Sequence, residues 1–452
     1  MRRLLALLGL LLLAGLLLTR AEPFAPTAEL VHPPDVVGRA TPITVVARDR
    51  GTGLGRVEIR LVPAAGGVPV VVAARDFPRV SFFGSGVHEA TVAATVDAAA
   101  AHVPEGPATL EVWATDHSWL AGLHRGPRLA HAVAVDLTPP TLDVLTNRHV
   151  VRQGGSECVV YRVGADAVRS GVEEAGDLYP GTAGVFADPT LRAALFAVPP
   201  DADPAPPIVV ATDAAGNRRE QHFDVTVRTR RFAERTLALS DAFLAGKIPP
   251  LLREAGLADD GDLVAGFRRV NGELRRATEA RIRALCAHPT PEPLWQGAFL
   301  RLPDSAPLAG FADHRTYEYQ GRAVDRSLHL GFDLASVKAA PVPAGNAGRV
   351  VFAGPLGIYG NAVLLDHGLG LFSLYGHMSA IAVQPGDAVA RGQVLGRTGD
   401  TGLAGGDHLH FGLLVDGTWV DPVEWWDAHW IEDHVLSRLA AFPRAAVPGA
   451  SS

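Results

Sequence analysis

The sequence predicts a mainly β, multidomain protein with two β-sandwiches, a helical arm and a C-terminal antiparallel β domain. Three observations support this fold class. At 452 residues the chain is too long for a single hydrophobic core. Its first half consists of short β-branched runs between turn residues, which is typical of strands. The hydrophobic period then changes to helical spacing, and β-type runs resume towards the C-terminus.

Residues 1–20 have the pattern of an export signal. Arg2 and Arg3 precede an uncharged apolar run from Leu4 to Thr19. This run is short for a membrane-spanning helix, which needs about 20 residues. No small-x-small cleavage site follows cleanly, so we favour an uncleaved signal anchor over a cleaved signal peptide. Both interpretations predict export of the rest of the chain, with the arginines inside.

Residues 28–137 and 138–229 are predicted to form two β-sandwich modules. Strand-like runs recur in both, and Thr138-Pro-Pro-Thr141 separates them. This Pro-Pro boundary and the string Ala211-Thr-Asp-Ala-Ala-Gly-Asn217 resemble bacterial immunoglobulin-like modules. Such modules imply spacers or adhesive surfaces, and no catalytic constellation is present in them.

Residues 230–290 are predicted to form a helical arm. Apolar residues recur there at helical spacing, namely Leu263, Phe267, Val270, Leu274, Ile282 and Leu285. A shorter helix is expected over residues 232–245, ending before Pro249 and Pro250. The arm could cover or position a site in the following domain, or it could be a packed linker, which we favour.

The C-terminal domain, residues 295–430, collects four histidines and an aspartate that suit a metal site. His408 and His410 share one face of a strand and look into one cleft. His329 and Asp333 can share an ion only if the backbone bends, which Gly331 permits. A catalytic zinc takes three protein ligands and leaves one position to water. With His377, which follows Tyr375 and Gly376, five candidates compete for three positions, and His367 is expected in a hairpin turn instead.

These motifs resemble the catalytic domain of the lysostaphin/LytM-type zinc metallopeptidases. The matching strings are His329-x-x-x-Asp333, Tyr375-Gly-His377 and His408-x-His410, with Gly368 and the turn Gly386-Asp-x-Val389-x-x-Gly392-Gln393. The resemblance implies one Zn²⁺ bound by His329, Asp333 and His410. It also implies that His377 and His408 are unliganded catalytic histidines. We assign His408 as the base and His377 to oxyanion stabilisation or leaving-group protonation.

The resemblance implies a zinc metalloendopeptidase that cuts peptide cross-links of bacterial peptidoglycan. With the export signal, it predicts a periplasmic or otherwise extracytoplasmic protein of the cell envelope, anchored to the inner membrane by its N-terminal apolar segment. One alternative is a non-hydrolytic regulator of other cell-wall hydrolases, and another is a wall-binding protein with a vestigial site. Some relatives are latent, so removal of residues before about Pro289 is expected to raise activity if the arm covers the cleft.

Composition indicates which partners are excluded and whether the cysteines form a disulfide. The net charge is −7 with acids and bases interspersed, which gives no basic surface for nucleic acid. Cys158 and Cys286, the two cysteines, lie in different predicted domains. We favour two separately buried thiols over a disulfide. Residues 441–452 are rich in proline, alanine and serine and are predicted to be a disordered tail.

Overall fold

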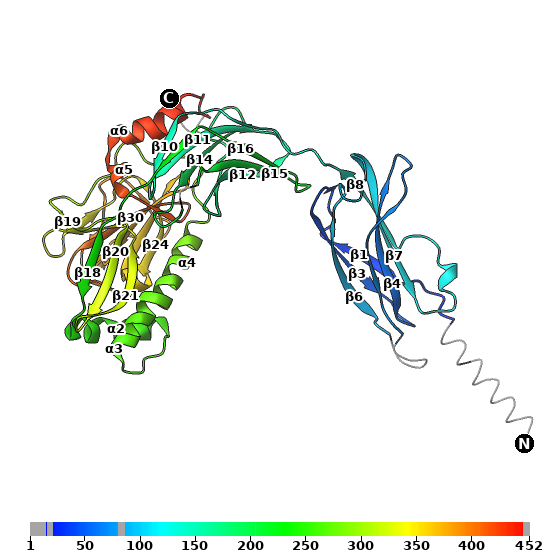
Figure 1. Cartoon of the computed structure of the whole chain (residues 1–452), viewed down its shortest axis with the longest axis horizontal. Coiled ribbons are helices and arrows are strands. Elements are labelled where there is room, and N and C mark those ends of the chain that lie inside the picture. The colour runs from blue at the N-terminus through cyan, green and yellow to red at the C-terminus, as the bar shows by residue number, and fades with distance from the viewer. Residues whose placement is uncertain (1–14, 16–20, 80–85, 204, 446–452) are drawn as a thin grey trace, which may run out of the picture. The chain divides into compact units, whose positions relative to one another are not determined.

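The structure is a computed structural model that describes residue 15 and residues 21–79, 86–203 and 205–445 (Figure 1). The predicted signal anchor or signal peptide, residues 1–20, therefore lies outside the described residues apart from residue 15, as does most of the predicted tail. Within the described ranges, no helix is long and apolar enough to cross a membrane. The described chain is mainly β and multidomain, as predicted.

The chain divides into two compact units. The first contains the described residues up to Pro140 with Asp166–Val168 and Ala211–Arg219. The second contains Thr141–Ala165, Arg169–Val210 and the described residues from Glu220 onwards. Most of the second β module, the arm and the C-terminal domain thus share one unit, and the module boundaries expected from sequence stay predictions.

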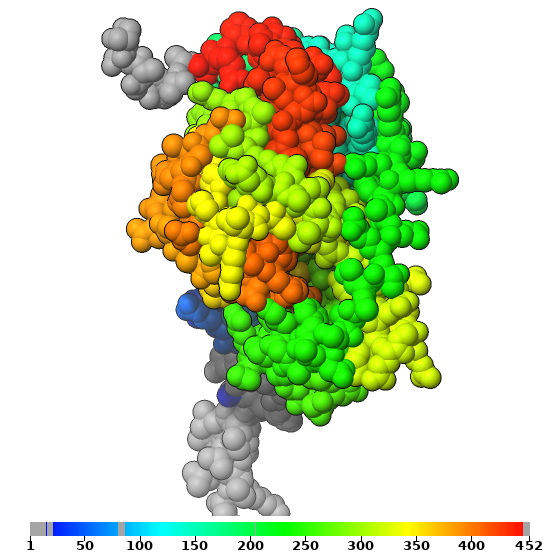
Figure 2. All heavy atoms as spheres, turned by 90° about the vertical axis from the view of Figure 1, so that its left-hand side faces the viewer, coloured from blue at the N-terminus to red at the C-terminus, as the bar shows by residue number. Residues whose placement is uncertain are grey.

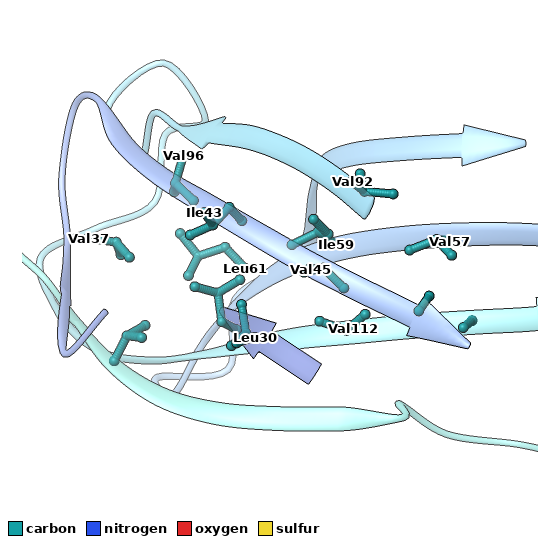
Figure 3. Packing of buried hydrophobic residues seen from close by; sticks show 14 of the residues in the cluster. Leu30, Val37, Ile43, Val45, Val57, Ile59, Leu61, Val92, Val96 and Val112 are labelled. Carbon is teal, nitrogen blue, oxygen red and sulfur yellow. The ribbon is translucent and has the colours of Figure 1, made fainter. Parts of the chain in front are cut away.

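The first unit contains two sheets around one apolar core. One sheet has the order β1-β3-β6 and the other β2-β8-β7-β4-β5. The strands are β1 (Thr27–Val31), β2 (Val36–Val37), β3 (Thr41–Arg48), β4 (Leu54–Pro63), β5 (Val70–Asp76), β6 (Glu89–Val96), β7 (Gly106–Asp116) and β8 (Leu129–Val135). Alternate side chains, such as Ile43 and Val45 of β3, point inward against Ile59 and Leu61 of β4 (Figure 3).

The next segment is also made of strands. They are β9 (Leu142–Val144), β10 (His149–Arg152), β11 (Ser156–Val163), β12 (Ala167–Glu174), β13 (Asp177–Pro180), β14 (Leu191–Ala197), β15 (Ile208–Asp213), β16 (Arg218–His222) and β17 (Val225–Arg228). They form sheets of order β14-β11-β9, β13-β12-β15-β16 and β10-β17. Cys158 of β11 is a buried free thiol, and Cys286 is another, which confirms the prediction of separate thiols.

The arm consists of β18 (Glu234–Ala238), α2 (Asp241–Ala255), α3 (Leu263–Arg269), a π-helical turn (Val270–Leu274) and α4 (Arg275–Leu285). The helical spacing over residues 263–285 is confirmed, but the expected short helix at 232–245 is wrong. β18 occupies its first part, and α2 continues through Pro249 and Pro250. Burial of Leu244, Ile248, Leu251 and Leu252 on one face of α2 offsets the two lost backbone donors.

The C-terminal domain is built on an eight-stranded sheet of order β19-β22-β30-β26-β25-β24-β28, with β31 paired to β30. Its neighbours are the sheets β18-β20-β21 and β23-β29-β27. The strands are β19 (Ala306–Ala309), β20 (Asp313–Tyr319), β21 (Arg322–His329), β22 (Phe332–Ala335), β23 (Pro341–Pro343), β24 (Gly348–Pro355), β25 (Asn361–Gly368), β26 (Leu371–Gly376), β27 (Ala380–Ile381), β28 (Ala388–Val389), β29 (Val394–Arg397), β30 (Leu409–Val415) and β31 (Thr418–Val420). Helices α5 (Pro422–Trp426), α6 (Ala428–Ile431) and α7 (Ser437–Ala440) follow.

One hydrophobic core joins the arm to the C-terminal domain. Leu244 and Ile248 of α2, Phe267 of α3 and Ile282 of α4 belong to the same buried cluster as Phe372 and Leu414 of the large sheet. The arm also extends a sheet of the domain, since β18 pairs in parallel with β20. The arm is therefore an integral part of this unit. The packed-linker interpretation underestimates how much of the core the arm supplies.

Candidate metal centre

Three ligand-type side chains, His329, Asp333 and His410, meet in the second unit. His329 Nε2 lies 3.0 Å from Asp333 Oδ1 and 3.2 Å from His410 Nδ1, and His410 Nδ1 lies 3.0 Å from the same carboxylate oxygen. Ligands at about 2.1 Å from a tetrahedral zinc are about 3.4 Å apart. The three donor atoms are thus spaced like one face of a zinc tetrahedron, and their chemistry fits that ion.

The sheet brings these residues together because two of them are neighbours across a strand pair. Asp333 of β22 lies opposite His410 of β30 in the antiparallel register. His329 ends β21, and the break before β22 falls at Gly331, as the sequence predicted. A Cβ atom at residue 331 would lie 2.6 Å from His410 Nε2, so only glycine allows the backbone to pass the imidazole this closely.

Backbone carbonyls orient both of these imidazoles. His329 Nδ1 donates to Gly310 O at 2.8 Å, and His410 Nε2 donates to Leu330 O at 3.3 Å. This leaves His329 Nε2 and His410 Nδ1 as lone-pair donors towards the site. Burial lowers the pKa of His410 to about 4, so the imidazole is held in the neutral form that metal binding requires.

Asp333 divides its two oxygens between the imidazoles and an arginine. Oδ1 faces the imidazoles, whereas Oδ2 accepts a hydrogen bond from Arg315 Nη2 at 2.8 Å. Burial opposes the carboxylate charge, but the surrounding imidazoles, His329 foremost, outweigh it and hold the pKa of Asp333 well below its usual range. Sequence reasoning missed Arg315, because an arginine in β20 has no local signature of contact with Asp333.

His377 and His408 lie beside these three residues, with their rings 4.8 Å apart. His377 Nδ1 donates to Thr401 O and His408 Nδ1 donates to Gly406 O, both at 2.8 Å. Each histidine therefore has Nε2 available on the side of the site, where His408 Nε2 lies 3.4 Å from Asp333 Oδ1. Burial opposes protonation of His408, but the Asp333 carboxylate outweighs this effect and raises the pKa of His408. His377 also has a φ of 62°, a left-handed conformation that non-glycine residues adopt rarely and often at functional sites.

A second network connects His410 to the arm. The Tyr359 ring lies 4.9 Å from the His410 ring, and its hydroxyl donates to Glu279 Oε1 of α4 at 2.9 Å. Trp419 Nε1 donates to the other oxygen of the same carboxylate at 2.6 Å. One carboxylate of the arm thus holds two aromatic rings next to the histidine.

The five site residues line a cavity of about 460 Å³. The arm supplies much of its wall through Leu237, Ala238, Leu239, Ser240, Phe243, Phe267 and Arg275. In the space-filling view, green arm residues lie against the yellow and orange surface of the C-terminal domain (Figure 2). The cavity can therefore hold a ligand between the candidate metal centre and the arm.

His367 does not belong to the site, and it ends up in β25 instead of the expected turn. Its Nδ1 donates to Ala347 O, and its Nε2 contacts the Ser373 hydroxyl, both at 2.7 Å. Burial lowers the pKa of His367 to about 4. It is a neutral core histidine that joins two strands through hydrogen bonds.

Comparison with known proteins assigns the domain that carries these residues. Residues 327–422 match the model of peptidase family M23. These residues form an M23 domain. All five candidate site residues lie within the matched range, and the resemblance to lysostaphin/LytM-type peptidases is confirmed.

Curated relatives match this M23 domain and little else. The DD-carboxypeptidase/endopeptidase Mpg of Neisseria meningitidis is 42% identical over 96 residues, which are 21% of this chain and 22% of that protein. The peptidoglycan DD-endopeptidase ShyA of Vibrio cholerae is 38% identical over 96 residues, with the same two shares. The chain spans about a fifth of the length of these relatives.

Solved structures with similarity to this chain include other M23 proteins. A peptidase M23 from Pseudomonas aeruginosa, described as putative, is 23% identical, with a TM-score of 0.39, over 61% of this chain and 94% of that one. A zinc-containing peptidase from Vibrio cholerae is 30% identical, with a TM-score of 0.26, over 28% of this chain and 40% of that one.

Proposed function

We propose that this chain is an exported zinc metalloendopeptidase that hydrolyses peptide cross-links of bacterial peptidoglycan. The observation that carries the proposal is the convergence of five side chains on one cavity. Three of them offer donor atoms within 3.2 Å of one another, and two further imidazoles lie beside them with Nδ1 bonded to backbone carbonyls. The match of residues 327–422 to peptidase family M23 supports peptidase activity. We extend the zinc dependence of that family to this chain.

In the proposed mechanism His329, Asp333 and His410 would hold the zinc ion. Bound zinc would polarise the scissile carbonyl and lower the pKa of a water molecule towards about 7. His408 Nε2 accepts the proton from the attacking water, because its Nδ1 is committed to Gly406 O. His377 Nε2 stabilises the oxyanion or protonates the leaving amine.

The substrate class rests on the relatives. The proteins from Neisseria and Vibrio are named as endopeptidases, and the latter as an endopeptidase of peptidoglycan. Because the match covers about a fifth of each relative, the relatives do not identify the bond that this chain cuts. The arm lines the cavity, so we propose that it takes part in selecting that bond.

A cell-envelope location follows from this substrate and from the predicted export signal. Peptidoglycan lies outside the cytoplasm, so a hydrolase of its cross-links must be exported. Attachment to the inner membrane through residues 1–20 stays a prediction. In this proposal the N-terminal segment attaches the protein to the membrane, and the M23 domain acts on peptidoglycan peptides.

The decisive experiment measures metal content and hydrolysis together. Purified full-length protein should contain about one zinc per chain and release soluble peptides from purified sacculi, and chelation should stop the release until zinc is restored. A protein that binds zinc but releases nothing would favour the non-hydrolytic regulator. The complete set of five side chains argues against that alternative, because a decayed site would show substitutions.

A further inference from the structure

A second cluster of ligand-type side chains lies in the first unit, apart from the M23 domain. Glu22, Asp49 and Asp116 each offer a carboxylate oxygen, and these oxygens lie within 4.8 Å of one another. Glu22 precedes β1, Asp49 follows β3, and Asp116 ends β7. Their exposed fractions are 9%, 5% and 6%, so three acids are buried side by side.

Backbone amides hold one oxygen of each carboxylate. Asp49 Oδ2 accepts from the amides of Gly51 at 3.1 Å and Gly53 at 2.7 Å, and Glu22 Oε2 accepts from Thr52 N at 2.8 Å. Asp116 Oδ1 accepts from the amide of Ser118 at 2.8 Å. These bonds fix where the acids point, but they supply no full positive charge.

Other oxygens in this cluster have no partner at all. Asp49 Oδ1 and Asp116 Oδ2 are buried and make no hydrogen bond. The hydroxyl of Thr52, a side chain that is 8% exposed, is also buried and makes no hydrogen bond. Among the described residues, no ion pair joins any of the three carboxylates to a lysine or arginine. Burial raises the pKa of Asp116 and the nearby charge of Asp49 adds to this effect, which outweighs the opposing effects of the Ser118 amide and of His124 and Arg128 at longer range. Buried, unpaired acids are costly, so a bound cation would stabilise this arrangement.

We propose that Glu22, Asp49 and Asp116 bind one calcium ion. Calcium takes oxygen ligands at about 2.4 Å, so two of its ligands are at most about 4.8 Å apart, which the three carboxylates satisfy. The donors are all oxygens, with no histidine or cysteine among them, as a hard cation prefers. Thr52 Oγ1 is a candidate neutral ligand. The ion would tie the segment before β1 to the turn after β3 and to the end of β7.

The test uses the full-length protein and calcium itself. After treatment with a calcium chelator, calorimetric titration should show one calcium ion per chain with a dissociation constant of about 10⁻⁴ to 10⁻³ M, and magnesium should bind at least about 10-fold more weakly. Asp49→Asn and Asp116→Asn keep the shape and the amide-bonded oxygen, and each should weaken binding at least about 10-fold. Asp76→Asn is the matched control, because Asp76 is an exposed acid of β5 that pairs with Arg56.

Thermal unfolding gives a second measurement. Calcium should raise the Tm of the first unit in the wild-type protein and leave both asparagine variants unchanged. In chelator the variants should be at least as stable as the wild type, because a repulsive charge has been removed. His410→Ala should bind calcium normally, which separates this site from the M23 domain.

Three results would overturn the proposal. They are no calcium binding by the wild-type protein at several millimolar, equal binding by the asparagine variants, and equal affinity for magnesium. If neither variant folds, the wild-type titration decides alone.

Discussion

The Glu279 carboxylate of the arm accepts a hydrogen bond from the hydroxyl of Tyr359, and the Tyr359 ring lies against the ring of His410. Through this contact α4 acts on the position of a candidate zinc ligand. Glu279→Gln loses the charge but keeps an acceptor, so the two aromatic rings lose part of their restraint. We expect zinc affinity and turnover each to fall about 10-fold, as for other residues that orient metal ligands. Zinc affinity is measured by competition with a chelator.

Arg281→Ala is the control for Glu279, because Arg281 is also on α4 and lies over Phe352 at 4.7 Å, away from the site residues. It should affect stability without changing zinc affinity. Equal effects of the two substitutions on zinc affinity would mean that Glu279 only attaches the helix.

Loss of a proposed ligand should remove the metal. His410→Ala and Asp333→Ala each leave two of three donors, and we expect zinc affinity to fall by orders of magnitude in the full-length protein. Asp333→Ala also leaves Arg315 without its ion pair, so its unfolding must be followed beside its metal content. Stoichiometric zinc in both folded variants after dialysis against a mild chelator would contradict the ligand set.

His377 and His408 should behave differently from the ligands. His377→Ala and His408→Ala should keep zinc and lose about 10²- to 10⁴-fold in turnover, the usual contribution of general acid–base groups. Metal analysis and sacculus hydrolysis on the same samples check this prediction. Zinc loss in either variant comparable to that of His410→Ala would move that histidine into the ligand set.

Glu424 should make the second unit less stable as the pH rises from about 6.5 to about 8. Burial raises the pKa of Glu424 to about 8, whereas the unfolded chain has the ordinary value near 4.5. Between these values the folded state keeps a proton that the unfolded state has released. The contribution of Glu424 to the free energy of unfolding therefore falls with rising pH over this window, by up to about 1.4 kcal/mol per pH unit, and levels off above about pH 8. Asp416, whose pKa burial also raises to about 8, adds to this fall, whereas the buried imidazoles of His367 and His410 oppose it below about pH 6.5.

Glu424→Gln removes this titration and should make the fall in the free energy of unfolding between about pH 6.5 and pH 8 less steep, in urea unfolding measured from pH 5 to pH 9 with the metal chelated. Glu432→Gln, at an exposed position nearby, should leave the slope unchanged. An identical slope in the wild type and in Glu424→Gln would show that the proton is bound elsewhere.

Removal of residues before about Pro289 should destabilise the M23 domain. Sequence alone predicted higher activity on truncation if the arm covers the cleft. However, the arm supplies Leu244, Ile248 and Phe267 to the core that it shares with the domain. We therefore expect the truncated chain to be insoluble or to melt at a markedly lower temperature. A soluble fragment with the Tm of the full-length unit would contradict the shared core.

Whether the arm inhibits activity is consequently a question for full-length variants. Phe243→Ala is suitable, since Phe243 lines the cavity and is only half-buried. Autoinhibition stays a prediction, and it requires this variant to be more active on sacculi at unchanged zinc content.

The parts of the site that could be predicted depend on local sequence patterns, in which the residues involved are close together in the chain. Alternation along a strand indicated that His408 and His410 face one cleft, and the need for a bend explained Gly331 between His329 and Asp333. The unpredicted parts come from contacts between distant segments. Arg315 of β20 contacts Asp333 of β22, which belongs to another sheet, and Glu279 of α4 contacts Tyr359. Helix α2 also runs through two prolines because tertiary burial outweighs local propensity.

The shared core also determines when this unit can fold during synthesis. The apolar faces of α2 and α3 are made early, whereas Leu414 and Trp419, which belong to the same cluster, emerge from the ribosome much later. Until then the arm exposes leucine, isoleucine and phenylalanine side chains that have nothing to cover them. If the chain is exported unfolded, as a consequence of the proposed function, the nascent arm should depend on a chaperone that keeps its helices apart until the last strands are present.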